Sequence, residues 1–208
     1  QKPLKNFITD KEGLESKMTK LVFATSNPHK LQEIKDIAGD INIEFLLPPN
    51  GFDPIENGTT FEENSYIKAK EAAKLSGIVA LADDSGLCVE ALDGAPGIYS
   101  ARYADTPQAR INKLLNAMNQ KENRRAKFVC AMTLVSPDGK IIFQTRGECH
   151  GNIAYKQAGT NGFGYDPIFL VGNGSTTMAE LSETEKNKIS HRGQALRNVL
   201  EFLKDTNI

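Results

Sequence analysis

Short apolar runs alternate with segments of helical period through the first half of the chain. Unbroken apolar runs occupy residues 21–24 and 78–82, and residues 43–47 form another candidate strand. Apolar runs of this length are typical of strands that are covered on both faces. Leu31 and Ile34 recur at helical spacing after the first run. The pattern therefore predicts buried strands at these segments and helices between them.

Local sequence signals predict where the helices begin. Ser26 or Asn27 can cap a helix whose first turn contains Pro28. Residues 60–76 open with the capping-box pattern T-F-E-E and continue as an Ala- and Lys-rich segment. Residues 106–118 are a further helix candidate.

The second half of the chain predicts a long β-hairpin followed by helices. Residues 128–135 and 140–146 flank the turn sequence Pro-Asp-Gly, and residues 168–171 form a short candidate strand. Ser182 with Glu185 is another capping box. The apolar stripe of the last helix consists of Leu196, Val199, Leu200 and Leu203. Strands alternating with helices, together with one long hairpin, predict an α/β fold with a mixed sheet.

Composition supports one globular domain. With 208 residues, 39% of them hydrophobic, the chain can bury a sizeable core. We expect residues 18–208 to form the domain and the polar residues 1–17 to be an N-terminal extension or a vector-derived remnant. The net charge of -1 gives no global reason to expect DNA, RNA or an anionic membrane as a partner. Three unpaired cysteines and no apolar stretch near the ~20 residues of a membrane span favour a cytoplasmic protein.

The first candidate site is the segment Thr25-Ser26-Asn27-Pro28-His29-Lys30. Where small polar residues lead from a strand into a helix, free backbone N–H groups and the helix dipole favour an anion. Lys30 adds a full positive charge one turn into the helix. These features predict phosphate binding. Taken alone, the segment favours the simpler interpretation that Ser26 or Asn27 only caps the helix.

The second candidate is Asp83-Asp84-Ser85-Gly86, directly after the apolar run at residues 78–82. Carboxylates at the carboxyl end of a buried strand lie where α/β proteins place their ligand sites. Successive side chains of a strand point to opposite faces, so the two aspartates are expected to have different roles. Mg²⁺ is normally held by one or two carboxylates and by phosphate oxygens. A magnesium site is therefore slightly favoured over a plain turn.

The third candidate is on the helix that follows Thr60. Asn64 and Lys68 share one face of that helix, and Glu63 lies beside it. Glu63 could bind a metal, and Lys68 could reach a phosphate. Taken alone, the segment favours the alternative in which Glu63 completes the capping box and Lys68 is solvated.

Two further candidates occur near the C-terminus. Residues 159–167, G-T-N-G-F-G-Y-D-P, allow the backbone to approach a flat ligand, on which Phe163 or Tyr165 could stack. A plain β-bend is an equal alternative for this segment. Lys186 and the sequence Ser190-His191-Arg192-Gly193 could face a pocket if the helix breaks there, although basic clusters usually form a solvated face.

Together these segments resemble the inosine triphosphate pyrophosphatase family of non-canonical purine nucleoside-triphosphate pyrophosphatases. The resemblance extends from Leu21 to about Leu203. Six motifs follow one another in the family's order: T-S-N-x-x-K, T-F-x-E-N-x-x-x-K-A, A-D-D-S-G-L, G-A-P-G-I-Y-S-A-R, G-x-G-Y-D-P and K-x-x-x-S-H-R. Each motif alone is weak, but six in order over this length are very specific.

The resemblance implies a long twisted mixed sheet flanked by helices, with two lobes, a central active-site cleft and a homodimeric assembly. The implied reaction is hydrolysis of ITP, dITP or XTP to the monophosphate and pyrophosphate, with Mg²⁺ as cofactor. Residues 25–30 and Lys68 would bind the triphosphate. Glu63 and Asp84 would be magnesium ligands, with Asp84 as proton acceptor and Asp83 supporting it. Other implied contacts to the nucleotide are Asn64, Ser85, Phe163, Gly164, Tyr165, Asp166, Lys186, His191 and Arg192.

Two other functions compete with this interpretation. The septum-associated nucleotide pyrophosphatases share the architecture and chemistry but favour modified pyrimidines, and the S-H-R segment argues against them. A non-catalytic module that senses purine triphosphates belongs to a different class. Such a module needs no metal ligands and no base, so Glu63, Asp84 and Lys68 argue against it.

Overall fold

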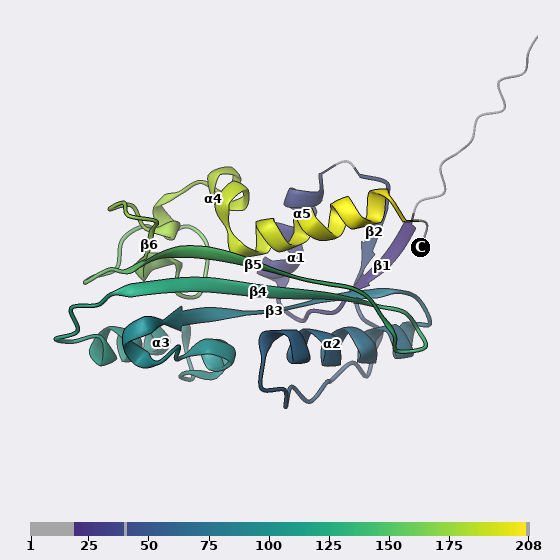
Figure 1. Cartoon of the computed structure of the whole chain (residues 1–208), viewed down its shortest axis with the longest axis horizontal. Helices are drawn as coiled ribbons and strands as arrows, with labels where there is room; N and C mark the ends of the chain where they lie inside the picture. The colour runs from purple at the N-terminus through teal and green to yellow at the C-terminus, as the bar shows by residue number, and fades with distance from the viewer. Residues whose placement is uncertain (1–18, 40, 207–208) are drawn as a thin grey trace, which may run out of the picture.

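The computed structural model describes residues 19–39 and 41–206 (Figure 1). The predicted N-terminal extension, residues 1–17, lies outside the described residues. Six strands form one sheet in the order β2-β1-β3-β4-β5-β6. The strands are β1 (Thr19–Phe23), β2 (Ile43–Leu46), β3 (Ala80–Val89), β4 (Arg125–Val135), β5 (Ile141–Ile153) and β6 (Phe169–Val171). Strand β1 is parallel to β2 and β3, and the other pairs are antiparallel, which confirms the mixed sheet.

The helices begin at the predicted caps. They are α1 (Pro28–Ala38), α2 (Phe61–Ser76), α3 (Pro107–Ala117), α4 (Glu183–Ile189) and α5 (His191–Lys204). Asn27 caps α1, and Ser182 forms the predicted capping box with Glu185 at α4. The box at α2 is only half formed, because the Glu63 carboxylate accepts from Thr59. No helix in the described ranges is long and apolar enough to cross a membrane.

Strand β3 is longer than its apolar run predicts. We expected it to end before Asp83, but it continues to Val89, because β4 pairs with it along its whole length. Its parallel pairing with β1 ends at Leu81. Asp83 and Asp84 therefore lie within a strand, just beyond the end of the parallel part of the sheet.

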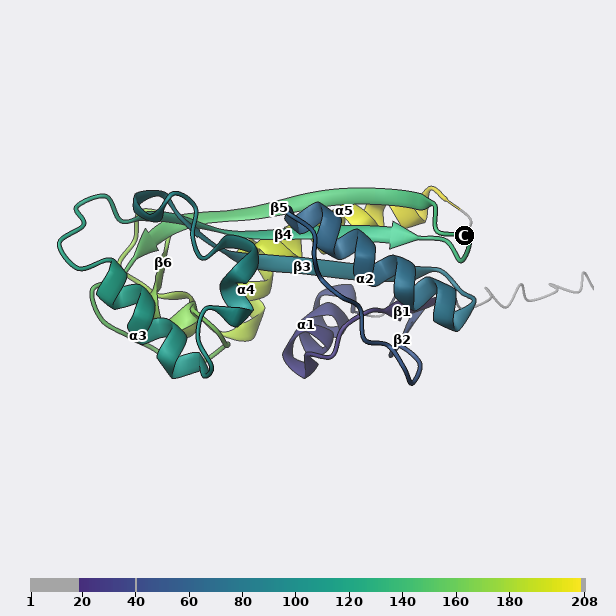
Figure 2. The ribbon, with the colours of Figure 1, turned by 90° about the horizontal axis from the view of Figure 1, so that it is seen from below.

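Helices cover both faces of the long strands. Helix α2 packs against β3 and β4 on one face, and α5 packs against β4 and β5 on the other (Figure 2). Gly147 on β5 makes the approach of α5 possible, because a Cβ there would overlap the backbone carbonyl of His191. The first turn of α5 is thereby fixed directly over the sheet.

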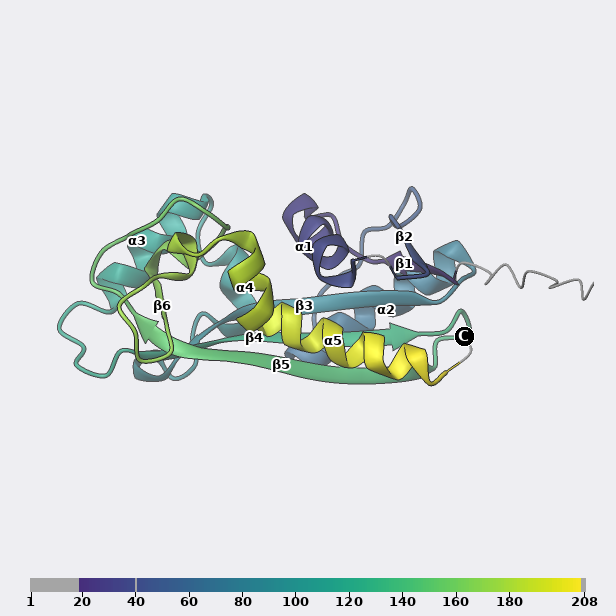
Figure 3. The same ribbon diagram turned by 90° about the horizontal axis from the view of Figure 1, so that it is seen from above.

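The hydrophobic core is divided between two lobes. One cluster packs around α3 and β6, with Leu114 and Phe169 fully buried. Another packs α1 and α5 around β1, with Phe23 and Leu196 fully buried. Helix α1 and the α3–β6 lobe lie on the same side of the long strands but are separated along them (Figure 3). The predicted two-lobe architecture is confirmed.

Candidate active site

A cavity of about 550 Å³ lies between the lobes. It brings together most of the predicted site residues, from six segments of the chain. The predicted residues on its wall are Thr25, Ser26, Asn27, Lys30, Lys68, Asp83, Asp84, Ser85, Phe163, Gly164, Tyr165, Asp166, Lys186, His191 and Arg192. Pro28, His29, Glu63 and Asn64 are outside this lining.

The start of α1 forms one end of the cavity. The Asn27 side chain accepts a hydrogen bond from the His29 N–H at 3.0 Å, and the Thr25 hydroxyl accepts from the Asn27 N–H at 3.0 Å. The predicted helix cap is therefore present. A cap does not exclude the phosphate role, since the positive end of the α1 dipole and the Lys30 ammonium remain at this end of the cavity.

The two adjacent aspartates face different partners, as strand geometry predicts. Asp83 is 1% exposed, and its Oδ2 lies 2.9 Å from the Lys30 Nζ and 3.1 Å from the Arg192 Nη2. Burial raises the pKa of the Asp83 carboxyl, but the charges of Lys30 and Arg192 outweigh burial and hold it below its usual range. Asp83 is thus a permanent anion that anchors two cations.

Asp84 faces a lysine on α2. Its Oδ1 lies 2.8 Å from the Lys68 Nζ, and its Oδ2 lies 3.4 Å from the Asn64 amide nitrogen. Burial raises the pKa of Asp84 above its usual range despite the Lys68 charge. Burial lowers the pKa of Lys68, but Asp84 and Asp83 outweigh it, so the ammonium stays protonated. A carboxylate of raised basicity beside a fixed cation suits a general base.

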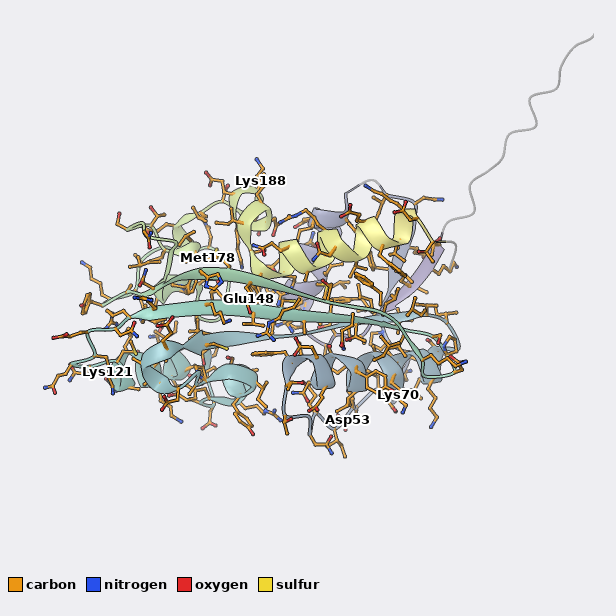
Figure 4. All side chains as sticks on the ribbon, in the orientation of Figure 1. Asp53, Lys70, Lys121, Glu148, Met178 and Lys188 are labelled. Atoms are coloured by element: carbon orange, nitrogen blue, oxygen red, sulfur yellow. The ribbon has the colours of Figure 1, made fainter. Side chains whose placement is uncertain are left out.

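Glu56 is a site residue that the sequence analysis missed. It lies on the cavity wall, and its Oε2 is 3.0 Å from the Lys68 Nζ, so that Lys68 joins it to Asp84. The loop before α2 carries Glu56, and it also carries Asp53 (Figure 4). Asp53 is a further lining residue of the cavity. No pattern in the loop sequence distinguishes Glu56 from a solvated glutamate.

Glu63, the predicted metal ligand, is outside the lining of the cavity that contains Asp84. Its side chain is exposed, and its Oε2 accepts from the backbone and hydroxyl of Thr59 at 2.6 and 2.8 Å. Glu63 therefore lies at the start of α2, but the expected capping box with Thr60 is only half formed. Within residues 19–39 and 41–206, no cluster of three or more His, Cys, Asp or Glu side chains could hold a metal by itself. A metal here would need ligands from the substrate.

The C-terminal candidates form a buried chain of alternating charges. The Glu33 carboxylate of α1 forms ion pairs with two cations: its Oε1 lies 2.7 Å from the Lys186 Nζ, and its Oε2 pairs with Arg192. Lys186 also lies 2.7 Å from the Asp166 Oδ2. Burial raises the pKa of Glu33, but Arg192 and Lys186 outweigh it and hold it below its usual value. Sequence reasoning also missed Glu33, although its place one turn after Lys30, on the same helix, could have suggested it.

Aromatic side chains enclose the same end of the cavity. The His191 ring stacks on Phe128 with centroids 4.9 Å apart. The Phe163 ring lies 4.6 Å from the Lys186 Nζ. Gly162, with φ +71°, has no room for a Cβ, which would overlap the Asp166 carboxylate. The glycine-rich segment thus wraps around Asp166 and presents Phe163.

The predicted break between α4 and α5 is present at Ser190, which caps α5. It places both His191 and Arg192 on the cavity wall, as the sequence analysis proposed. Burial lowers the pKa of His191 well below its usual value, and its Nδ1 is buried without a hydrogen-bond partner. A neutral His191 can donate from one ring nitrogen only.

The chain matches the Ham1 family model over residues 21–202. The chain belongs to the Ham1 family. A dITP/XTP pyrophosphatase of Synechocystis sp. is 44% identical over 88% of this Ham1 chain and 94% of its own length. A dITP/XTP pyrophosphatase of Exiguobacterium sp. is 47% identical over 89% of the chain and 99% of its own length.

Solved structures share the fold of this Ham1 chain. A HAM1 protein from Coxiella burnetii superposes with a TM-score of 0.84 at 42% identity, covering 91% of this chain and all of that one. A nucleoside-triphosphatase, dITP/XTP pyrophosphatase, from Mycobacterium abscessus superposes with a TM-score of 0.70 at 40% identity, covering 88% and 99% of the two chains. The fold expected from the resemblance is therefore confirmed.

Proposed function

We propose that this protein hydrolyses non-canonical purine nucleoside triphosphates, ITP, dITP and XTP, to the monophosphate and pyrophosphate. One observation carries the proposal. A single cavity joins an acid–base end, Asp84 with Lys68, to an aromatic and polar end, Phe163 with Asp166. The dITP/XTP pyrophosphatase relatives, at 44% and 47% identity, support the same reaction.

We propose Mg²⁺ as the cofactor, with Asp84 and Glu56 as its protein ligands. Both carboxylates line the cavity beside Lys68. Magnesium takes one or two carboxylates together with phosphate oxygens, and this donor set fits that requirement. When bound, the cation neutralises phosphate charge and makes the phosphorus easier to attack. Glu63, which the family resemblance suggested, is engaged at the start of α2 instead.

The charged side chains divide the reaction between them. Lys68, and the first turn of α1 with Lys30, counter the charge of the triphosphate, which otherwise repels a hydroxide. Asp84 takes the proton from a water molecule that attacks the α-phosphorus, and pyrophosphate leaves. Asp83 holds Lys30 and Arg192 in place through its buried carboxylate.

The acceptor and donor groups at the other end of the cavity suit an oxopurine. Hypoxanthine and xanthine present an acceptor oxygen at C6, whereas adenine presents an amino donor there. Arg192 offers only donors, and neutral His191 can add one more. Asp166, an acceptor that is 3% exposed, complements the N1–H that hypoxanthine and xanthine carry. An adenine would leave these groups unpaired.

The first prediction is a strong preference for ITP and XTP over ATP. Sites built on such hydrogen bonds can reject the wrong partner by about 10⁴-fold. The measurement is kcat/KM from pyrophosphate release with ITP, XTP, GTP and ATP in the presence of magnesium. Equal values for ITP and ATP would contradict the assigned substrate class. Tight binding of ITP without pyrophosphate release would favour the non-catalytic sensor.

The second prediction separates the two candidate glutamates. Glu56→Gln should raise the magnesium concentration for half-maximal activity by about tenfold or more, because even indirect partners of a metal contribute this much affinity. Glu63→Gln, the matched control on α2, should leave the magnesium requirement unchanged. Mn²⁺ binding, followed by electron paramagnetic resonance, should weaken in the first variant only. The opposite pattern would restore Glu63 as the ligand.

We also propose that the protein is a cytoplasmic homodimer, as the family resemblance implies. Light scattering on the purified chain measures the assembly directly.

A further inference from the structure

One aromatic contact connects the start of α1 to the glycine-rich segment of the other lobe. The His29 ring, at the start of α1, stacks on the Phe163 ring with centroids 5.4 Å apart and an interplanar angle of 19°. Phe163 belongs to the glycine-rich segment of the other lobe and lines the cavity. The two rings are 134 positions apart in sequence, as their residue numbers show. Their contact forms only because the fold brings α1 to that lobe.

The neighbours of Phe163 differ in how firmly they are held. Lys186 and Arg192 lie near its ring at 4.6 and 5.7 Å, and both are fixed by buried ion pairs. The His29 side chain is exposed, and among the described residues its ring makes no hydrogen bond or ion pair. His29 is therefore the neighbour that can move away from Phe163 at the lowest cost.

A flat base can bind between the two rings once the His29 side chain has moved outward. A base that contacts a ring on each face needs the rings about 7 Å apart, twice an aromatic contact of about 3.5 Å. Near-parallel rings with centroids 5.4 Å apart are already in contact, so the exposed His29 side chain has to rotate outward to open this gap. Every purine has a π-face, so stacking holds the base without reading its edge.

We propose that the purine base binds between His29 and Phe163, so that His29 is a base-stacking residue and not a phosphate ligand. The inference rests on the proposed nucleotide substrate. The edge of the base then faces Asp166 and Arg192, while its triphosphate extends past Lys30 toward Lys68. Helix α1 thereby contacts both ends of the substrate and holds them in register.

The chain contains no tryptophan, which allows a direct test. His29→Trp introduces one fluorophore at the stack. The α,β-methylene analogue of ITP should quench its emission, because the base then lies against the indole, and inorganic tripolyphosphate should not. A red shift without quenching would mean that the indole moves into solvent. If the analogue inhibits the same variant but leaves the spectrum unchanged, the base does not contact the indole. Either result overturns the proposal.

Kinetics give an independent test in the native background. His29→Ala should raise KM for ITP by about 5- to 100-fold, the usual effect of removing one stacking ring. Inhibition by tripolyphosphate should stay unchanged, and His29→Phe should restore KM. Gln32→Ala, an exposed neighbour on α1, is the control. Equal weakening of ITP and tripolyphosphate would make His29 a phosphate ligand. Pyrophosphate release by the unaltered protein tests the proposed function separately.

Discussion

Replacement of Asp84 by asparagine is expected to lower turnover of ITP by about 10²-fold or more while the protein stays folded. The carboxylate lies in the cavity with its Oδ1 2.8 Å from the Lys68 Nζ, and burial raises its pKa. An amide of the same shape cannot accept a proton and is a poor magnesium ligand. Lys68 retains Glu56 as a partner, so the substitution leaves no cation isolated. The measurement is kcat from pyrophosphate release, with thermal unfolding of both proteins.

A matched control makes the Asp84 result specific. Asp36→Asn removes one carboxylate from the exposed surface of α1, outside the cavity, and should leave kcat unchanged. Near-normal turnover of Asp84→Asn would show that another group accepts the proton. Loss of activity accompanied by a large fall in melting temperature would show a structural role for Asp84.

The predictable parts of the fold are those set by local chemistry. The start of α1 follows from Asn27 and Pro28, because a side-chain acceptor and a fixed φ act within one turn. The buried strand at residues 21–24 follows from its apolar run. Strand β3 was predicted too short because the polar segment Asp83-Asp84-Ser85-Gly86 interrupts its apolar pattern, and pairing with β4 decides its length. That pairing depends on residues some 50 positions away, which local patterns do not contain.

The candidate site was predictable where motifs carry it, and unpredictable where contacts are non-local. Asp84 and Lys68 were expected, and they meet at 2.8 Å. Glu56 and Glu33 were missed, because a glutamate gains its role from the cations that the fold places beside it. The position of Glu33 on α1 could have suggested it, but its two ion pairs form only because α1 packs next to α4 and α5. For the same reason, the lowered pKa of His191 follows first from its burial, which depends on the fold, and the charge of the neighbouring Arg192 adds to it.

Arg192→Met is expected to destabilise the protein by about 3–5 kcal/mol, the usual effect of removing one partner from a buried ion pair. The guanidinium is 2% exposed and binds Asp83, Glu33 and Ser85. Methionine is of similar length but leaves two carboxylates without their shared cation. Arg197→Met is the control on the same helix, since Arg197 is exposed and, within the described part of the chain, its guanidinium hydrogen-bonds to backbone carbonyls only. The measurement is the free energy of unfolding in urea.

The pH dependence of this difference identifies its cause. In the native protein the pKa values of Asp83 and Glu33 are lowered, so their stabilisation is present above their unfolded pKa values and is lost as pH falls. Without Arg192, fewer cations oppose the effect of burial, so the pKa values of Asp83 and Glu33 both rise. Protonation of these carboxyls then removes the uncompensated charge. The destabilisation of Arg192→Met should therefore shrink as pH is lowered from 7 toward 4. A loss that is independent of pH would mean that Arg192 stabilises the fold by packing, and that the chain of alternating charges is not what holds α1, α4 and α5 around the cavity.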